Sequence, residues 1–307
     1  MPWNVTDIAD QTGRVFVITG ANSGLGLEAT KVLAQRGATV VMACRTVEKA
    51  EAVAAPIRAA APTATLEVMA LDLSSLDSVG RFAEALAAKC PRVDVLMNNA
   101  GVMALPYRKT ADGFEMQFGT NHLGHYALTA KVLPLLEASG RARVVTVSSL
   151  AHQMGTIRFE DLQWEKGYSK WPAYGQSKLA NLLFTYELER WLRRNGKSTI
   201  AMAAHPGYAA TNLQAVGPQM EQSTVGSLFM KLGNSVLAQS AEMGALPQLY
   251  AAVHPDVKGG QYVGPDGLME MSGFPKVGDS NAKSKDESVA ARLWEVSASL
   301  TKVAFAP

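Results

Sequence analysis

A tyrosine and a lysine four positions apart near the middle of the chain could perform acid–base chemistry. Tyr174 and Lys178 lie in the stretch WPAYGQSKLANLLF, which is typical of a helix. Residues i and i+4 are neighbours on a helix, about 5–6 Å apart at Cβ. An ammonium beside a phenol lowers the pKa of the phenol from its usual value of about 10, which suits proton transfer near neutral pH. The spacing alone is a weak signal, because the same pair also occurs on the solvent-facing side of ordinary helices.

The elements that must position this pair alternate between apolar runs and amphipathic stretches. Most of the apolar runs are continuous, as expected of strands covered on both faces. This alternation predicts a parallel sheet with helices on both sides, and right-handed crossovers then give one doubly wound α/β domain, a Rossmann fold, over residues 1–307. The expected strands are Arg14–Thr19, Ala38–Ala43, Ala64–Ala70, Val93–Met97, Arg143–Ser148 and Ser198–Ala204, and the expected helices are Gly24–Arg36, Thr46–Ala61, Ser75–Lys89, Gly113–Leu136 and Ala173–Arg194.

Two segments interrupt the alternation. Residues 151–171 follow the fifth expected strand, and residues 212–237 follow the sixth. Loops at the carboxyl ends of strands build the ligand crevice of a doubly wound sheet. We therefore expect both insertions to form substrate walls or lids, with plain surface elaboration as the alternative. Trp164, Trp171 and Tyr208 lie near these segments and are the expected substrate contacts, unless they only pack.

A glycine-rich turn, TGANSGLGLEA, leads from the first expected strand into the first helix. Small residues let the backbone approach a ligand, and the helix N-terminus offers free N–H groups and a partial positive charge. A glycine triplet alone is weak, but its position between strand and helix is the context that a dinucleotide-binding turn requires. The turn residues that we expect to bind the cofactor are Gly20, Asn22, Ser23, Gly24, Leu25 and Gly26.

The end of the second expected strand indicates which dinucleotide binds. An acidic residue there holds the ribose 2′-hydroxyl of NAD, whereas an arginine accommodates the 2′-phosphate of NADP. The segment VVMACRTVEK carries Arg45 and has no acid before Glu48, while Lys49 adds positive charge. NADP is therefore the expected cofactor and NAD the alternative. Arg45 could instead cap the strand or pair with an acid.

Composition excludes several other classes of function. The chain has 307 residues, 48% hydrophobic and 18% charged, so it can bury a large core. Its net charge of +2 is spread without a block of like charge, so no nucleic-acid partner is expected. Cys44, Cys90 and the histidines show no disulfide or metal-ligand spacing, and His122 and His125 are expected to pack or to face solvent. No signal peptide or membrane-length apolar run is present, which predicts a cytoplasmic protein without a membrane span.

Taken in order, these motifs resemble those of the short-chain dehydrogenase/reductase family from about residue 14 to residue 211. TGANSGLG is similar to the family's nucleotide turn, and Asn98-Asn99-Ala100-Gly101 to the segment after its fourth strand. ACRTVEKAE, SSLAHQMG, YGQSKLANLLF and HPGYAATNL look like the branch of retinol dehydrogenases and WW-domain-containing oxidoreductases. The cofactor-binding residues that the resemblance adds are Asp72, Leu73, Asn99, Ala100, Gly101, Tyr174, Lys178, Pro206, Gly207 and Thr211.

The resemblance also implies a reaction, reversible hydride transfer between a nicotinamide and a carbonyl or alcohol. Tyr174 would be the general acid and base, and Lys178 would hold the ribose and lower the pKa of the tyrosine. Ser149 would donate a second hydrogen bond to the developing alkoxide, and Asn121 would anchor a water chain that returns protons through Lys178. Alternation along VVTVSS puts Ser148 and Ser149 on opposite sides of the strand, and the family pattern favours Ser149.

The expected partner is a small, apolar carbonyl or alcohol substrate. A catalytically silent NADP-binding sensor or interaction module on the same fold is the alternative, although such proteins usually lose the tyrosine or the lysine. An epimerase or dehydratase of the extended relatives is a third candidate, but the part after His205 is short for a separate substrate domain. Family members often dimerise or tetramerise through the helices that carry the catalytic asparagine and tyrosine, so a homodimer, a homotetramer and a monomer all stay open. Membrane-bound members of the branch carry an N-terminal hydrophobic anchor, a pattern that MPWNVTDIADQTG does not show.

Overall fold

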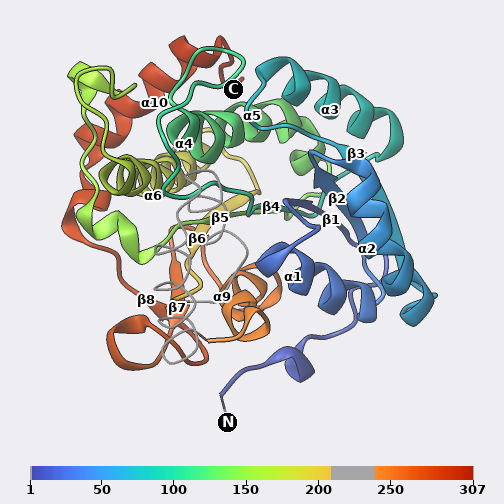
Figure 1. Ribbon diagram of the computed structural model, residues 1–307. Coiled ribbons are helices and arrows are strands. Elements are labelled where there is room, and N and C mark those ends of the chain that lie inside the picture. Colours follow the sequence, from blue (N-terminus) through green and yellow to red (C-terminus); the bar gives the residue numbers. More distant parts are fainter. Residues whose placement is uncertain (1, 209–238, 307) are drawn as a thin grey trace.

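The apolar runs of the sequence form one sheet, which has eight strands within the part of the chain that the structure describes, residues 2–208 and 239–306 (Figure 1). The structure is a computed structural model. The strand order is β3-β2-β1-β4-β5-β6-β7-β8, with β8 antiparallel to β7 and all other neighbours parallel. The strands are β1 (Val15–Thr19), β2 (Thr39–Cys44), β3 (Thr65–Ala70), β4 (Val95–Asn98), β5 (Arg143–Val147), β6 (Ile200–Ala204), β7 (Tyr262–Pro265) and β8 (Pro275–Gly278).

Helices cover both faces of the sheet, which confirms the predicted doubly wound fold. Successive side chains of a strand point to opposite faces. Phe16 and Ile18 of β1 accordingly pack in one core with the helices drawn below the sheet in Figure 1, and Val17 packs in the other core with the helices above it. The first group is α1 (Gly24–Gln35), α2 (Val47–Ala60) and α9 (Ala241–Val253), and the second is α3 (Leu76–Lys89), α5 (Gly124–Glu137), α6 (Lys170–Arg194) and α10 (Glu287–Thr301).

The predicted helix over residues 113–136 differs in detail from the observed one. It starts as α4 (Met116–Phe118), continues through a π-helical turn, η2 (Gly119–Leu123), and then becomes α5. A π-helical turn inside an α-helix is rare and often marks a functional site. Asn121 lies at the centre of this turn.

The predicted insertion at 151–171 contains short 3₁₀ helices and the first residues of α6. These helices are η3 (Leu150–Met154) and η4 (Phe159–Asp161), and α6 begins at Lys170. Pro172 therefore falls in the first turn of α6, where proline is tolerated. The insertion expected at 212–237 lies outside the described residues.

The elements after β6 were not predicted from the sequence. They comprise α9, β7, β8 and α10, with the remaining 3₁₀ helices of the described chain at η1 (Val5–Asp7), η5 (Leu268–Glu270) and η6 (Ala282–Lys285). Helix α10 packs on α6 and α5, where Trp294 stacks on Phe184 with ring centroids 5.9 Å apart and lies 4.5 Å from the ring of Phe305. This helix thus covers the outer side of α5 and α6.

The strand order reverses between β1 and β4, and in doubly wound sheets ligands bind at such a switch point, outside the carboxyl ends of the strands. The glycine turn follows β1, and the NNAG segment begins at the end of β4. Ser149 follows β5, and the His205-Pro206-Gly207 segment follows β6. The motifs therefore share one edge of the sheet. Within the described residues, no helix combines the length and the apolar character that crossing a membrane requires.

Candidate active site

The glycine turn is shaped by close packing of its own backbone. Gly20 has a φ of +67°, a left-handed conformation that favours glycine. A Cβ added to Gly26 would lie 2.4 Å from the Gly20 carbonyl oxygen and 2.6 Å from Asn99 Nδ2, so no side chain fits there. Ser23 is the N-cap of α1, but its side chain makes no capping hydrogen bond. The first turn of α1 therefore keeps N–H groups available for an anion.

Thr19, the last residue of β1, connects the glycine turn to the NNAG segment. Its hydroxyl oxygen accepts hydrogen bonds from the backbone N–H groups of Asn99 and Ala100, both at 2.9 Å. The Asn99 side chain donates in return to the Thr19 carbonyl at 2.7 Å. Asn99, Ala100 and Gly101 are half-buried, so the segment lines the edge of the sheet beside the turn.

The residues expected at the adenosine end lie on neighbouring elements. Arg45 is exposed and, within the described chain, makes no hydrogen bond or ion pair, so it neither caps the strand nor pairs with an acid. Asp72 Oδ1 accepts from the backbone N–H and the hydroxyl of Ser74, at 2.9 and 2.6 Å. Leu73 is buried against Gly124 of α5, and the Leu25 carbonyl accepts from Gln248 Nε2 at 3.1 Å.

Helix α6 carries the pair that opened the sequence analysis, and both residues are buried. Tyr174 is 4% exposed and Lys178 3%, so the polar face of this helix packs against the protein and does not face solvent. Lys178 Nζ lies 5.7 Å from the centroid of the tyrosine ring and donates to the Val147 carbonyl at 3.1 Å. Asn181, one turn further on, donates to the same carbonyl at 3.1 Å.

The two serines after β5 have different partners, as the alternation of side chains predicts. Ser148 is buried and its hydroxyl donates to the Lys178 carbonyl at 2.9 Å. Ser149 is half-buried and hydrogen bonds with the Tyr174 side chain. It also caps η3 by accepting from the Ala151 N–H at 3.2 Å. Ser149 is therefore the serine beside the phenol.

Asn121 joins the NNAG segment to α6. Its side chain accepts from the Val102 N–H at 2.7 Å and donates at 2.9 Å to both the Val102 carbonyl and the Ser177 hydroxyl. A Cβ added to Gly101 would lie 3.2 Å from Asn121 Oδ1 and 3.6 Å from Lys178 Nζ. The asparagine, the lysine and the backbone after β4 thus meet at one point.

Burial sets the electrostatics of this cluster. It raises the pKa of Tyr174 to about 12, against a smaller lowering by the hydrogen bond with Ser149. It also lowers the pKa of Lys178 to about 8. In this structure the pKa of the phenol lies above its ordinary value, because desolvation outweighs the hydrogen bond with Ser149, and the predicted lowering by Lys178 stays a prediction. At neutral pH, Tyr174 is a protonated phenol.

The segment after β6 rests on a buried histidine that the sequence did not single out. His205 is fully buried, stacks on Tyr262 with ring centroids 5.0 Å apart, and lies 3.1 Å from a carboxylate oxygen of Glu270. This contact, more than the nearby positive charge of Lys276, keeps the pKa of Glu270 below its ordinary value. Gly207 has a φ of +64°.

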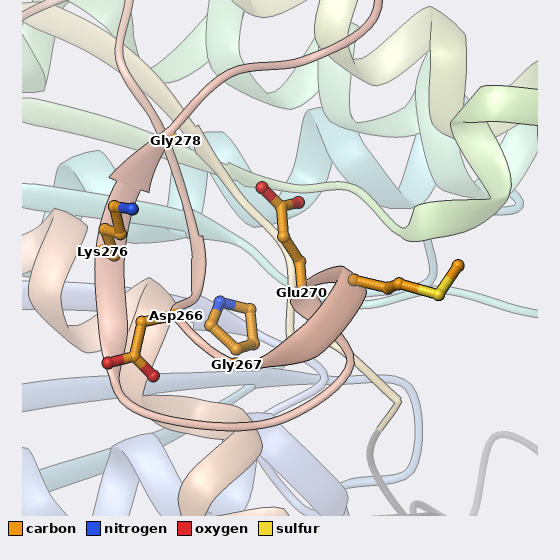
Figure 2. Close-up of a pocket in the computed structure, with 7 residues that line it drawn as sticks. Asp266, Gly267, Glu270, Lys276 and Gly278 are labelled. Carbon is orange, nitrogen blue, oxygen red and sulfur yellow. The ribbon is translucent and has the colours of Figure 1, made fainter.

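A cavity of about 200 Å³ lies within the β7–β8 hairpin, with Glu270 and Lys276 in its wall (Figure 2). None of its lining residues belongs to the cluster around Tyr174. Pro206 lies in that segment, and its carbonyl accepts from Gln239 at 2.6 Å. Thr211, expected to contact the cofactor, lies outside the described residues.

The expected substrate contacts fall in different surroundings. Trp171 is 43% exposed and its ring centroid is 6.4 Å from that of Tyr174, so it borders the cluster. Trp164 is buried under the Arg158 guanidinium, which lies 4.1 Å from its ring centroid. Tyr208 is half-buried at the end of the described segment, where its N–H donates to the Met271 carbonyl at 2.7 Å.

Comparisons with known proteins agree with this geometry. The family model described as short chain dehydrogenase matches residues 14–222. Human retinol dehydrogenase 13 is 42% identical over 295 residues, 94% of this chain and 84% of the relative. A crystal structure of an uncharacterized protein from Mycobacterium paratuberculosis has a TM-score of 0.83 at 44% identity, with all of both chains covered.

A more distant structure, described as a candidate NAD(P)-dependent gluconate 5-dehydrogenase from Beutenbergia cavernae, contains bound NADP at low occupancy. It has a TM-score of 0.63 at 25% identity and covers 82% of this chain and 95% of its own.

Proposed function

The chain belongs to the short chain dehydrogenase family, and on this premise we propose that it transfers a hydride between NADP(H) and a small apolar carbonyl or alcohol. It is an oxidoreductase of that family, acting on CH–OH groups. One observation carries the proposal. A buried phenol and a buried ammonium on α6 adjoin the serine after β5 and the asparagine of the π-helical turn, at the edge of the sheet that carries the glycine turn.

One feature of the structure suits a dinucleotide, and a second favours NADP over NAD. The packing at Gly26 leaves a backbone cradle at the N-terminus of α1 that suits a pyrophosphate. Arg45 is exposed without an acidic partner, and an arginine at this position suits a 2′-phosphate. When bound, the nicotinamide supplies or accepts the hydride. The NADP of the Beutenbergia cavernae structure is consistent with this choice.

In the reduction direction the side chains act on the substrate oxygen. As the hydride reaches the carbonyl carbon, negative charge grows on this oxygen, and Tyr174 donates its phenolic proton to it. Ser149 donates a second hydrogen bond to the same oxygen, as in an oxyanion hole. Lys178 would hold the ribose of the bound cofactor and supply a positive charge there, and Asn121 would anchor the water chain that returns a proton toward the tyrosine.

The cofactor assignment is tested by titrating the protein with NADPH and with NADH, using the fluorescence of its tryptophans. We expect NADPH to bind more tightly, and Arg45→Gln to remove most of the difference. Arg141→Gln is the matched control, because Arg141 is also exposed but precedes β5 at the opposite edge of the sheet. Equal affinity of the wild type for both nucleotides would refute the assignment.

The chemistry is tested with NADPH and a panel of carbonyl compounds that runs from small ketones to retinal. General acid catalysis contributes about 10²–10⁴-fold, so Tyr174→Phe should lower turnover by at least about 100-fold while NADPH still binds. Tyr126→Phe is the control, because Tyr126 is equally buried and its hydroxyl lacks a partner within the described chain. A wild type that binds NADPH firmly and reduces no compound would instead favour the silent sensor or interaction module.

We also propose a cytoplasmic location. Cys44 and Cys90 are both free thiols and buried, which suits a reducing compartment. Fractionation of cells that express the protein at its natural level would test this, and recovery in the membrane pellet after a high-salt wash would contradict it.

A further inference from the structure

A second buried histidine, His125, touches the proposed site from behind. It lies in the first turn of α5, directly after the π-helical turn, and is 1% exposed. Its Nδ1 lies 2.9 Å from the backbone carbonyl oxygen of Asn121. Its Nε2 lies 2.9 Å from the hydroxyl of Thr19, the residue that holds the NNAG segment. One imidazole ring thus bridges the helix of the catalytic asparagine and the end of β1.

The hydrogen bonds around this ring fix its tautomer. A carbonyl oxygen only accepts, so Nδ1 carries the proton and donates it to Asn121. In the neutral ring Nε2 is then an acceptor, and it takes the hydroxyl proton of Thr19. The threonine oxygen is left to accept the two N–H groups of Asn99 and Ala100. The Met97 carbonyl, at 3.3 Å, is a more distant acceptor for the same hydroxyl proton.

The ring stays neutral under ordinary conditions. Burial outweighs the hydrogen bond to Asn121 and, with a smaller contribution from the positive charge of Lys178, lowers the pKa of His125 to about 4. A protonated ring would lose its acceptor nitrogen and release Thr19. The Nδ1–H tautomer is therefore the form that holds both partners in place.

We propose that His125 is a positioning residue, which fixes the Asn121 carbonyl relative to the Thr19 hydroxyl and so holds the NNAG segment against the π-helical turn. This inference rests on the proposed function. Within a π-helical turn the backbone pairing is shifted, and a side-chain donor on the Asn121 carbonyl defines where this oxygen points.

His122, which lies in the π-helical turn just before α5, is a buried histidine with different partners. It is also 1% exposed, but its Nε2 lies 2.9 Å from the Ser297 hydroxyl of α10, and its ring interacts with the side chain of Asn181 on α6. The sequence predicted packing or solvent exposure for both histidines, and both are buried. Their contacts separate them, because His125 bridges Asn121 and Thr19, whereas His122 interacts with Ser297 of the C-terminal helix and with Asn181.

Two substitutions separate the two hydrogen bonds of His125. His125→Asn keeps a donor near the Nδ1 position and loses the Nε2 acceptor, so the Thr19 side should loosen. His125→Gln keeps an acceptor near the Nε2 position and loses the donor to the Asn121 carbonyl. A single hydrogen bond of this kind is worth roughly threefold to tenfold in an equilibrium or rate. We expect His125→Asn to weaken NADPH binding by about this factor, and His125→Gln to lower kcat by about this factor with NADPH affinity kept.

His122→Asn and His122→Gln are the matched controls, with thermal unfolding measured for all four variants. The controls should lose comparable stability, yet keep kcat and NADPH affinity within about twofold of the wild type. If each His125 variant changes these two constants no more than its His122 counterpart, the positioning role is overturned. If the wild type itself binds no NADPH or reduces nothing, the proposed function fails instead.

The tautomer offers a test that needs no variant and no turnover. In protein labelled with ¹⁵N-histidine, NMR correlations at pH 7 should show His125 in the Nδ1–H form. An Nε2–H form, or a protonated ring, would overturn the bridge even if the variants failed to fold.

Discussion

Replacing Lys178 with methionine should stabilise the protein at neutral pH while abolishing its activity. The lysine is 3% exposed, and no acidic side chain of the described residues pairs with it. Burial disfavours its charged form and lowers its pKa from 10.5 to about 8. The ammonium that the reaction needs is therefore held in the fold at a cost in stability. Methionine has a similar length and carries no charge.

The size of this cost follows from the change in pKa. One pKa unit corresponds to about 1.4 kcal/mol, so a fall from 10.5 to about 8 amounts to about 3 kcal/mol at pH 7. The substitution also removes the hydrogen bond to the Val147 carbonyl, worth about 1 kcal/mol. Asn181 still donates to that carbonyl, so it is not left without a partner. We expect Lys178→Met to raise the free energy of unfolding by about 2 kcal/mol at pH 7.

The gain should depend on pH in a defined direction. The unfolded chain keeps a lysine pKa near 10.5, so between pH 8 and 10.5 it binds more protons than the native state. The cost is complete below about pH 8 and disappears as the pH rises toward 10.5. Urea unfolding should therefore show the gain of about 2 kcal/mol at pH 7 falling to about zero at pH 9.5.

Lys131→Met on the exposed side of α5 is the control, and it should change the free energy of unfolding by less than about 0.5 kcal/mol at either pH. A Lys178→Met protein that is less stable than the wild type at pH 7 would refute the account of a buried, uncompensated charge. A gain that stays constant up to pH 9.5 would refute it equally, because then the charge is not its source.

Three other outcomes follow from the geometry. Gly26→Ala should abolish NADPH binding, because its Cβ would lie 2.4 Å from the Gly20 carbonyl oxygen. Gly80→Ala in α3, where an added Cβ meets no atom of another element within 4 Å, should instead stabilise the fold by about 0.5–1 kcal/mol. Nucleotide titration measures the first effect, and urea unfolding of both variants measures the second. Glu270→Gln should lower the free energy of unfolding by less than about 1 kcal/mol at pH 7, because the contact with His205 is partly exposed. The pKa of this carboxyl is lowered in the folded state, so its contribution to stability is lost as the pH falls through that pKa. Unfolding measured at a pH below it should therefore show no difference between Glu270→Gln and the wild type. Helix α10 covers α5 and α6, so light scattering after size exclusion should give the mass of a monomer, and a dimer stable at micromolar concentration would contradict this.

The features that the sequence predicted best are those that depend on residues close together along the chain. The glycine turn is local, because Gly20 and Gly26 must be small wherever a strand turns tightly into a helix. The choice between Ser148 and Ser149 is also local, since alternation along a strand separates them. The strands β1 to β6 appear within about two residues of their predicted bounds. All but β3, the outermost strand, are continuous apolar runs that are buried over most of their length.

The features that were missed depend on contacts between distant segments. Strand β7 has four residues, too short an apolar run to stand out, and it forms against β6 and β8. Helix α10 has a local N-cap at Asp286, but its place in the fold is set by aromatic packing on α6, which the local pattern does not reveal. The bridge through His125 needs β1, β4 and α5 to meet, so spacing along the sequence carries no trace of it.

The pKa values of Tyr174 and Lys178 show why their spacing could not identify the site. On a solvated helix the ammonium would lower the pKa of the phenol, and the pair would favour a phenolate. Burial acts in the opposite sense on both groups, raising the pKa of the phenol to about 12 and lowering that of the ammonium to about 8. At neutral pH the phenol therefore holds its proton until a stronger base, a developing alkoxide, lies against it. In the reduction direction, such a pair is therefore set to protonate the substrate oxygen.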